Sequence, residues 1–298
     1  MKYEVKFDLN RDFDELLIKE LLANKFEVDA TLSSDEIRCK YFNLKKRLIK
    51  IKSRNVYVSK DLKVHSAFKK GFDNIKNKLL KGENINIYLS KNLMKTDYND
   101  SLLNDWGIYH LHLGECLENN NSNFIKRTNP LLFIRIDDHN AYLIDVLDHG
   151  NWACQKLIKT VHDNWPKSIE KYLLKGVSGL SVTLSDNDII KMRKAGVNTA
   201  IEIAPNLVYS LLGGGYNSSG LSVYVSREVD YYYNFLYKLQ MQIFNDLEQI
   251  SQDIFKHKKN INNKIELKLI VLNQVFYLEE QNTNSLFNLN MSFPYLMV

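Results

Sequence analysis

Apolar residues alternate with polar ones in several short segments of the chain, which is the pattern of half-buried strands. Alternating or continuously apolar runs occupy residues 85–90, 108–114, 131–137 and 141–150. Between the last two runs, the residues DDHN are typical of a tight hairpin turn. We therefore predict an antiparallel sheet in which the last two runs form a hairpin.

Apolar residues recur three or four positions apart in segments that lie before these strands, as they do on one face of an amphipathic helix. The predicted helices cover residues 11–25, 33–50 and 66–81, and short strand-like runs lie at 2–9 and 54–59. Helices that pack on an antiparallel sheet define an α+β fold. The sequence therefore predicts the α+β class.

The composition changes toward small and turn-forming residues at the sequence KGVSG, and we place the main domain boundary near residue 175. The first predicted domain, 1–175, is α+β and carries the candidate catalytic and RNA-binding residues. The second, 176–298, is also α+β, with predicted strands at 179–184 and 220–226.

A long amphipathic helix is predicted near the end of the chain, over residues 229–257. Leu236, Ile243 and Ile250 fall seven positions apart in it, which is the spacing of residues that pair helices in coiled coils. We therefore expect this helix to contact a protein partner or a second copy of the chain.

The chain has 298 residues, of which 45% are hydrophobic and 25% charged, as is usual in soluble globular proteins. No stretch approaches the roughly 18 apolar residues that a membrane helix needs, and the first residues lack the pattern of a secretory signal. The 3 cysteines have no paired spacing, which indicates free thiols in a reducing compartment. These features predict a cytoplasmic protein without membrane association.

Basic residues are concentrated in one part of the chain, although the formal net charge is only +5. Residues 38–81 contain 15 Lys or Arg but 2 Asp, a local charge of +13, whereas the rest holds 25 basic and 33 acidic residues and is −8. Such a segregated charge is neutralised most readily by a polyanion such as nucleic acid. The residues that we expect to contact nucleic acid are Lys45, Lys46, Arg47, Lys50, Lys52, Arg54, Lys69 and Lys70.

Two interpretations of this basic segment remain open. The aromatic residues within it offer flat surfaces on which bases stack, which favours RNA as the partner. Alternatively, the lysines gather on solvated helix faces and bind nothing. The aromatic residues are Tyr41, Phe42, Tyr57, Phe68 and Phe72.

Two histidines stand one residue apart in a predicted strand, where alternate residues face the same side. His110 and His112 therefore share one face. If the neighbouring strands belong to the same sheet, Arg135 and Asp145 decorate that face as well, and His149 follows the last strand. These five residues are the candidate catalytic set.

Imidazoles, a guanidinium and a carboxylate together suit the cleavage of RNA through its own 2′-hydroxyl group. An imidazole titrates near neutral pH, so one ring can remove a proton while another donates one. A guanidinium can bind the phosphate and stabilise its transition-state charge, and Asp145 would orient a histidine or pair with Arg135. This chemistry needs no metal or other cofactor, and we predict a metal-independent endoribonuclease.

The order of these elements and the residues that they carry resemble a known family. Two helices after an early strand, an antiparallel meander with His and Arg, and basic residues on the helices are similar to the core of RelE-type ribonuclease toxins. The resemblance covers roughly residues 34–150 and implies a ribonuclease of the toxin or phage-defence kind. The chain differs from that family in its length, its additional C-terminal half and its paired H-x-H motif.

Other interpretations of the histidine pair stay open at this point. An H-x-H strand can chelate a metal ion, with Glu115, Asp145 or His149 completing the site of a metal-dependent enzyme. Alternatively, His110 and His112 are hydrogen-bonded rings in the protein interior. The chain would then be a non-catalytic protein that binds nucleic acid or mediates assembly.

Overall fold

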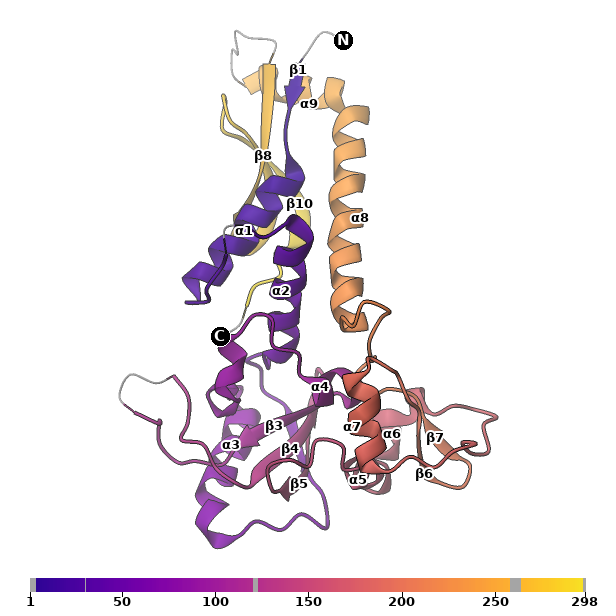
Figure 1. Cartoon of the computed structure of the whole chain (residues 1–298). Helices are drawn as coiled ribbons and strands as arrows, with labels where there is room; N and C mark the ends of the chain where they lie inside the picture. The colour runs from indigo at the N-terminus through magenta and orange to yellow at the C-terminus, as the bar shows by residue number, and fades with distance from the viewer. Residues whose placement is uncertain (1–3, 30, 120–122, 258–263, 297–298) are drawn as a thin grey trace. The chain divides into compact units, whose positions relative to one another are not determined.

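A computed structural model describes residues 4–29, 31–119, 123–257 and 264–296, with the backbone alone for 255–257. The chain divides into two compact units (Figure 1). Unit 1 consists of Met1–Lys45 with Arg227–Leu296, and unit 2 is built on Lys46–Ser226. Both units contain helices and mixed sheets, so the fold is α+β, as the sequence predicts.

The boundary predicted near residue 175 lies inside unit 2. Unit 1 instead joins the beginning of the chain to its end, because β1 (Glu4–Lys6) pairs in parallel with β8 (Lys264–Leu272). Parallel pairing between residues so far apart leaves no local trace in composition. The composition shift at KGVSG therefore lies in a loop within unit 2 and not at the division between the units.

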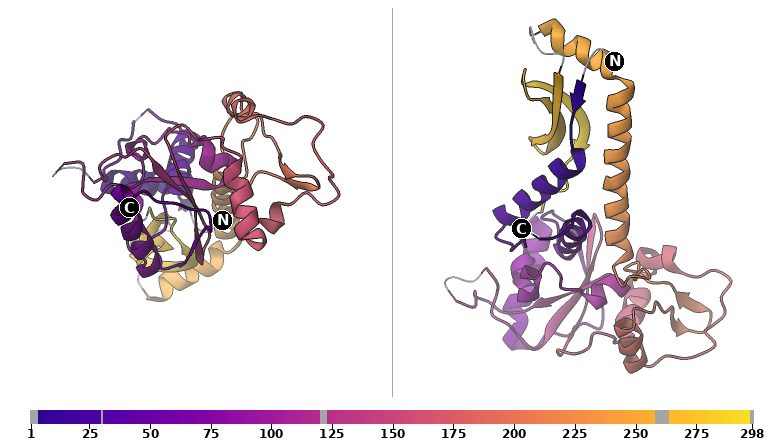
Figure 2. Two further views of the ribbon diagram at one scale, coloured as in Figure 1. Left: turned by 90° about the horizontal axis from the view of Figure 1, so that it is seen from below. Right: turned by 45° about the horizontal axis from the view of Figure 1, so that its top comes forward.

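Unit 1 holds a sheet in the order β1-β8-β9-β10, with β9 at Val275–Glu280 and β10 at Ser285–Ser292. Aromatic rings fill its core, where Tyr232 stacks on both Phe13 and Phe42 at 5.2 Å between ring centroids. The helices of this unit, which Figure 2 shows from two further sides, are α1 (Leu9–Ala23), most of α2 (Ser34–Arg47), most of α8 (Val223–Asn245) and α9 (Leu247–His257).

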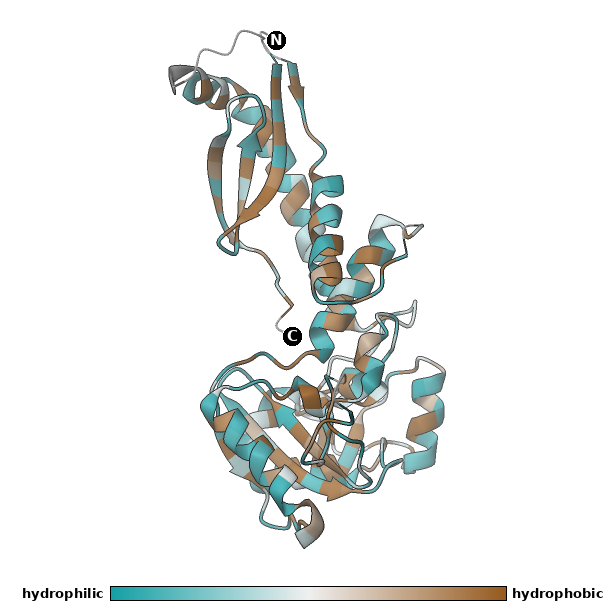
Figure 3. Cartoon of the chain, turned by 90° about the vertical axis from the view of Figure 1, so that its left-hand side faces the viewer, coloured by the Kyte–Doolittle hydropathy of each residue, from teal (hydrophilic) through white to brown (hydrophobic). Residues whose placement is uncertain are grey.

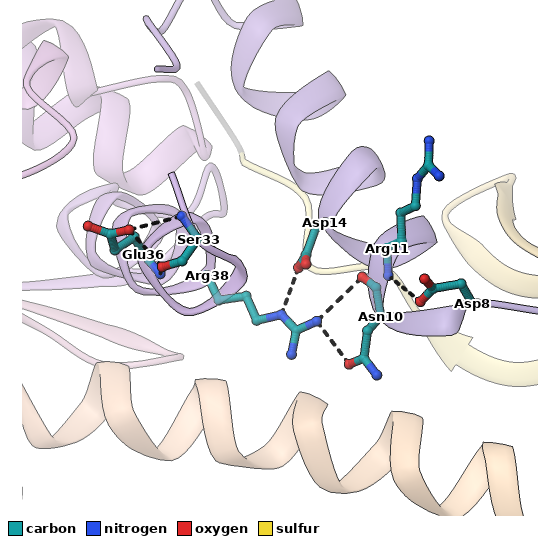
Figure 4. A network of polar contacts seen from close by, with 7 residues as sticks. All are labelled: Asp8, Asn10, Arg11, Asp14, Ser33, Glu36 and Arg38. Carbon is teal, nitrogen blue, oxygen red and sulfur yellow. Dashed lines mark hydrogen bonds and ion pairs between the residues drawn. The ribbon is translucent and has the colours of Figure 1, made fainter. Parts of the chain in front are cut away.

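A buried ion pair joins the first two helices of unit 1. The Arg38 guanidinium donates to Asp14 at 2.7 Å and to the side chain of Asn10 at 3.0 Å (Figure 4). Only 2% of Arg38 is exposed. The first arginine of the basic segment therefore serves the packing of unit 1, because a buried charge needs such a partner.

The helix predicted over residues 229–257 is two helices that meet at an angle at Asp246 (Figure 1). Two of its predicted contact residues, Leu236 and Ile243, are almost completely buried. Their spacing thus reflects packing within the protein, and contact with a partner through this helix stays a prediction.

Unit 2 holds a second sheet in the order β2-β5-β4-β3. The predicted hairpin is confirmed, since β4 and β5 pair antiparallel and Asp137 Oδ1 accepts hydrogen bonds from the turn N–H groups of His139 and Asn140 at 2.9 and 2.8 Å. The sheet is mixed rather than purely antiparallel, because β2 runs parallel to β5. The strands are β2 (Asn55–Val58), β3 (Ile108–His112), β4 (Leu131–Ile136) and β5 (Asn140–Leu147).

Helices and short strands surround this sheet, and polar and apolar residues interleave along them as in amphipathic elements (Figure 3). The helices of unit 2 are η1 (Ser66–Phe68), α3 (Lys69–Lys81), η2 (Asn86–Tyr88), η3 (Lys91–Met94), α4 (Ser101–Trp106), α5 (Lys156–Asn164), α6 (Pro166–Ile169), η4 (Glu170–Tyr172) and α7 (Asp186–Lys194), and a small sheet pairs β6 (Ile201–Ala204) with β7 (Leu207–Tyr209).

Three short apolar runs that the alternation predicts as strands take other structures. Residues 85–90 contain the 3-10 turn η2, residues 179–184 are irregular, and residues 220–226 include the first turn of α8, which begins at Val223. In the first case the side chain of Asn86 bonds both the N–H and the C=O of Ile49, at 2.8 and 3.1 Å. Such side-chain bonds replace the partners that a sheet would have supplied.

Across the part of the chain that the structure describes, no helix combines the length and the apolar character that spanning a membrane requires.

Candidate functional site

The strand register places the candidate catalytic side chains on one face of the unit 2 sheet, as their alternation predicts. His110 lies opposite Phe133, which in turn lies opposite Asp145. Arg135 lies opposite Ile108, further along the same strands. Residues directly opposite one another in an antiparallel pair point to the same face.

The middle of that face is covered by the hydrophobic core of unit 2. Phe133 is completely buried, and Leu157 and Ile158 of α5 belong to the same apolar cluster. Since protein interiors are close-packed, substrate has no access to the centre of the face. The polar side chains therefore fall into two groups, one around His110 and one around Arg135.

Two histidines contact one tryptophan at the first of these places, and a third histidine lies near them. The ring centroid of Trp152 lies 4.7 Å from that of His110 and 4.8 Å from that of His149. His112 lies near both His110 and His149, because positive charge on either of their rings would lower the pKa of His112 further. We call these residues, together with Asp100, the histidine cluster.

A short helix and its two ends position the first ring of the cluster. Asp100 caps the N-terminus of α4, where its Oδ1 accepts a hydrogen bond from Leu103 N at 3.0 Å. Gly107, at φ 66°, ends the helix in the left-handed conformation, and β3 starts at the next residue. The second carboxylate oxygen of Asp100 then lies 3.8 Å from His110 Nδ1.

His110 is held in its neutral form. Its side chain is 12% exposed, and burial is the main cause that lowers its pKa, against the opposing charge of Asp100. Its Nδ1 is buried and forms no hydrogen bond with any residue that the structure describes. A buried imidazole nitrogen without a hydrogen-bond partner is unusual.

His112 is fixed by the backbone of Thr128. Its Nδ1 lies 3.1 Å from Thr128 N and 3.2 Å from Thr128 O, so either tautomer of the ring has a partner. Burial lowers the pKa of His112 to about 4, and the nearby charge of Arg127 acts in the same direction. This ring is therefore neutral at physiological pH.

His149 is the exposed member of the cluster, in the turn after β5. Its backbone N–H donates to the side chain of Asn129 at 2.6 Å, which holds the turn in place. Trp152, three residues later, is held in turn because Arg193 donates a hydrogen bond to its carbonyl oxygen. An exposed imidazole and a buried one thus contact the same indole.

Asp145 and Arg135 do not pair with each other or with a histidine, contrary to the prediction from their shared face. Asp145 forms an ion pair with Lys156 of α5 at 3.1 Å and accepts a hydrogen bond from its neighbour Val146 N. Arg135 lies against the ring of Tyr172 at 5.9 Å. The reason is the core residue Phe133, which lies between Asp145 and β3 in the register.

The two arginines of the predicted nucleic-acid set within unit 2 are structural. Arg47 is 4% exposed and donates to the carbonyl oxygens of Asn92 and Lys95 at 3.0 and 2.8 Å. Arg54 is 7% exposed and donates to the carbonyl oxygens of Lys50, Lys52 and Asp137. Both guanidiniums bind backbone in the interior, so neither is available to a phosphate.

Lys46 is also turned inward. Its Nζ donates to Asn104 Oδ1 at 2.8 Å, to Gly213 O at 3.2 Å and to Ser222 Oγ at 2.7 Å. Burial lowers its pKa to about 8. Lys45, at the end of unit 1, is half-buried over the ring of Phe42 at 5.9 Å.

Four lysines of the set remain exposed on unit 2, namely Lys50, Lys52, Lys69 and Lys70. Lys69 pairs with Asp73 at 3.0 Å and Lys70 with Glu115 at 2.7 Å, but exposed pairs of this kind are weak and readily exchanged. Of the residues in unit 2 that we predicted to contact nucleic acid, these four lysines are therefore exposed, whereas both arginines are buried.

Sequence reasoning did not single out Trp152 or Asp100. Trp152 follows His149 by three residues in the segment HGNW, so its proximity in sequence is a signal that could have been used. Asp100 precedes His110 by ten residues, and only the turn of the chain at Gly107 brings its carboxylate back to the ring.

Within the described ranges, no group of three or more His, Cys, Asp or Glu side chains is arranged to hold a metal ion. Glu115, which the sequence offered as a possible third ligand, contacts Lys70 instead.

Comparisons of the chain with protein-family models, curated proteins and solved structures found no match.

Proposed function

We propose that this chain is a metal-independent endoribonuclease of the toxin or phage-defence type, with the histidine cluster as its catalytic site. The observation that supports this best is the pair of imidazoles that both contact Trp152, with ring centroids 4.7 Å from that of the indole for His110 and 4.8 Å for His149. One ring is desolvated and neutral, whereas the other is exposed. Two titratable groups in such different environments suit the roles of base and acid.

The proposed reaction is an attack of the 2′-hydroxyl of RNA on the adjacent phosphate. Neutral His110 accepts the proton of that hydroxyl while the 2′-oxygen bonds to phosphorus. The bond from phosphorus to the 5′-oxygen breaks, and protonated His149 donates its proton to this leaving oxygen. The exposed Arg127, whose charge acts on the neighbouring His112, supplies positive charge for the phosphate in place of the buried Arg135.

The experiment is to incubate the protein with a single-stranded RNA in EDTA and follow cleavage on a gel. We expect products that end in a 2′,3′-cyclic phosphate, and a loss of about a hundredfold or more in rate for His149→Ala and His110→Ala. His139→Ala is the matched control, because His139 is an exposed histidine in the β4–β5 turn of the same unit. No cleavage by the wild type, or equal rates in all variants, would contradict the proposal.

A second candidate function is binding of nucleic acid without turnover. It is favoured by the exposed Lys50, Lys52, Lys69 and Lys70, and by the burial of His110 and His112. This function predicts salt-sensitive binding, with the logarithm of the affinity falling as the logarithm of salt rises. The gel assay and a binding titration on the same RNA separate the two candidates.

A further inference from the structure

A second group of aromatic side chains lies on unit 2, away from the histidine cluster. Tyr57 of β2 stacks on Tyr142 of β5, with ring centroids 5.6 Å apart and planes inclined by 17°. Trp165, between α5 and α6, lies 5.1 Å from Tyr142. Tyr57 is 43% exposed and Trp165 is partly exposed, so part of each side chain is open to solvent.

In the strand register, this aromatic group adjoins the positively charged Arg135. Tyr57 lies opposite Tyr142 in the parallel pair, and Tyr142 lies opposite Arg135 in the antiparallel pair, so the three form one row across the sheet. Arg135 lies 5.9 Å from the ring centre of Tyr172, and the exposed Lys171 lies 5.0 Å from the same ring. We call Tyr57, Tyr142, Trp165 and Tyr172 the aromatic surface.

Within the described part of the chain, Arg135 lacks the partners that a buried charge normally has, and this indicates a ligand. It is 6% exposed, yet among the residues described its guanidinium forms neither an ion pair nor a hydrogen bond, and its Nη1 is fully buried without a partner. A buried charge is normally paired, because leaving water costs several kcal/mol. Arg38, Arg47 and Arg54 are also buried, but each of their guanidiniums donates to at least two acceptors, whereas that of Arg135 donates to none that the structure describes.

The carboxylate beside this group has a structural use. Asp137 accepts a hydrogen bond from the Tyr142 hydroxyl at 3.2 Å and from the backbone of the hairpin turn. It fixes the ring of Tyr142 rather than compensating Arg135. The aromatic surface therefore combines partly exposed aromatic side chains with a cation that has no ion-pair or hydrogen-bond partner among the described residues, and with an exposed lysine.

We propose that the aromatic surface binds single-stranded RNA, with bases stacked on Tyr57 and Trp165 and the backbone drawn by the charges of Arg135 and Lys171. Flat aromatic rings beside cations are the arrangement with which proteins hold unpaired nucleotides, whereas a duplex hides the faces of its bases. This inference rests on the proposed function, because it names the substrate class of that enzyme and where it is held.

The test uses the full-length protein and an oligonucleotide that cannot be cleaved. A 12-nucleotide adenine strand with 2′-O-methyl groups lacks the attacking hydroxyl, so its binding is independent of catalysis. We expect it to quench tryptophan fluorescence, and Trp165→Phe to remove that change. A duplex of the same strand with its complement should bind at least tenfold more weakly.

Variants at Tyr57 give the sharpest comparison. Tyr57→Ala should weaken binding about tenfold, since it removes one stacking face, whereas Tyr57→Phe keeps the ring and should stay within about twofold. Tyr233→Ala is the matched control, because Tyr233 is an exposed tyrosine (57%) on α8 in unit 1. Circular dichroism melting curves establish that each variant is folded.

The outcomes separate this inference from the ribonuclease proposal. Binding of the methylated strand that depends on Tyr57 supports the aromatic surface even if unmodified RNA is never cut. Absence of quenching, equal binding by Tyr57→Ala and the wild type, or equal binding of duplex and single strand overturns it, even if RNA is cleaved.

Discussion

Burial sets the charge of the ionisable side chains that matter most in unit 2. His110 and His112 are neutral because desolvation disfavours the imidazolium form. The guanidinium of Arg135 is buried and has no hydrogen-bond or ion-pair partner among the residues that the structure describes. Residues of the same type on the surface, such as His149 and Arg127, are exposed to solvent.

The low pKa of His112 makes stability depend on pH. Its pKa is about 4 in the folded protein against 6.5 for the free group, so between these values the unfolded chain binds a proton that the folded protein does not. The free energy of unfolding should therefore fall as the pH falls from 6.5 to 4, by up to about 3 kcal/mol from this group. Urea unfolding at several pH values measures it.

The control for this prediction is His112→Asn, which does not titrate in this range and whose side-chain amide can still face Thr128. The loss of stability on acidification should be smaller in the variant than in the wild type. Equal losses in both proteins would show that His112 titrates normally.

At the scale of elements, one lysine ties the end of α2 to the glycine-rich loop that follows β7. Lys46 Nζ bonds Gly213 O in that loop and Asn104 of α4. A side chain at position 213 would collide with the carbonyl groups of Leu103 and Asn104, so only glycine permits this close approach. Gly213 therefore serves the packing of this loop against α4.

Replacing Lys46 with Met should destabilise the protein at pH 7 by about 1–3 kcal/mol, because buried acceptors lose their donor. The wild type should gain stability as the pH rises from 8 toward 10.5, since the unfolded lysine still holds its proton there and the folded one has released it. Thermal melts at pH 7 and 9.5 check both statements. If the wild type gained no more stability than the Lys46→Met variant between pH 7 and 9.5, the lowered pKa of Lys46 would be contradicted.

At the scale of the whole molecule, the divisions at residues 45 and 226 reflect two separate cores. The core of unit 2 joins Phe133 and Leu157 with Ile189 and Tyr209, which lie on the far side of residue 175. A fragment that ends at residue 175 would expose the apolar surface that these residues cover.

We therefore expect a fragment of residues 46–226 to unfold cooperatively in urea, and a fragment of residues 1–175 to aggregate or to unfold without a cooperative transition. Far-ultraviolet circular dichroism during a urea titration is the measurement. Cooperative unfolding of the 1–175 fragment, with native-like spectra, would instead support the boundary predicted from composition.

Much of the local structure could be predicted from the chain alone. Alternation located β4 and β5, and the DDHN turn identified their pairing, because both signals lie within a few residues. The same alternation placed His110, Asp145 and Arg135 on one face. It failed at residues 85–90, where the side chain of Asn86 satisfies the backbone of a distant residue.

The amino-acid sequence by itself determined the α+β class, the hairpin and the shared face of the candidate residues, because these follow from periodicity over short distances. The tertiary structure decided which polar groups are buried and which chain segments meet. In the folded chain Arg47 and Arg54 are buried, Lys46 is turned inward, Trp152 contacts both His110 and His149, and β1 pairs with β8. Desolvation and long-range pairing depend on residues far apart in the chain, so no local pattern encodes them.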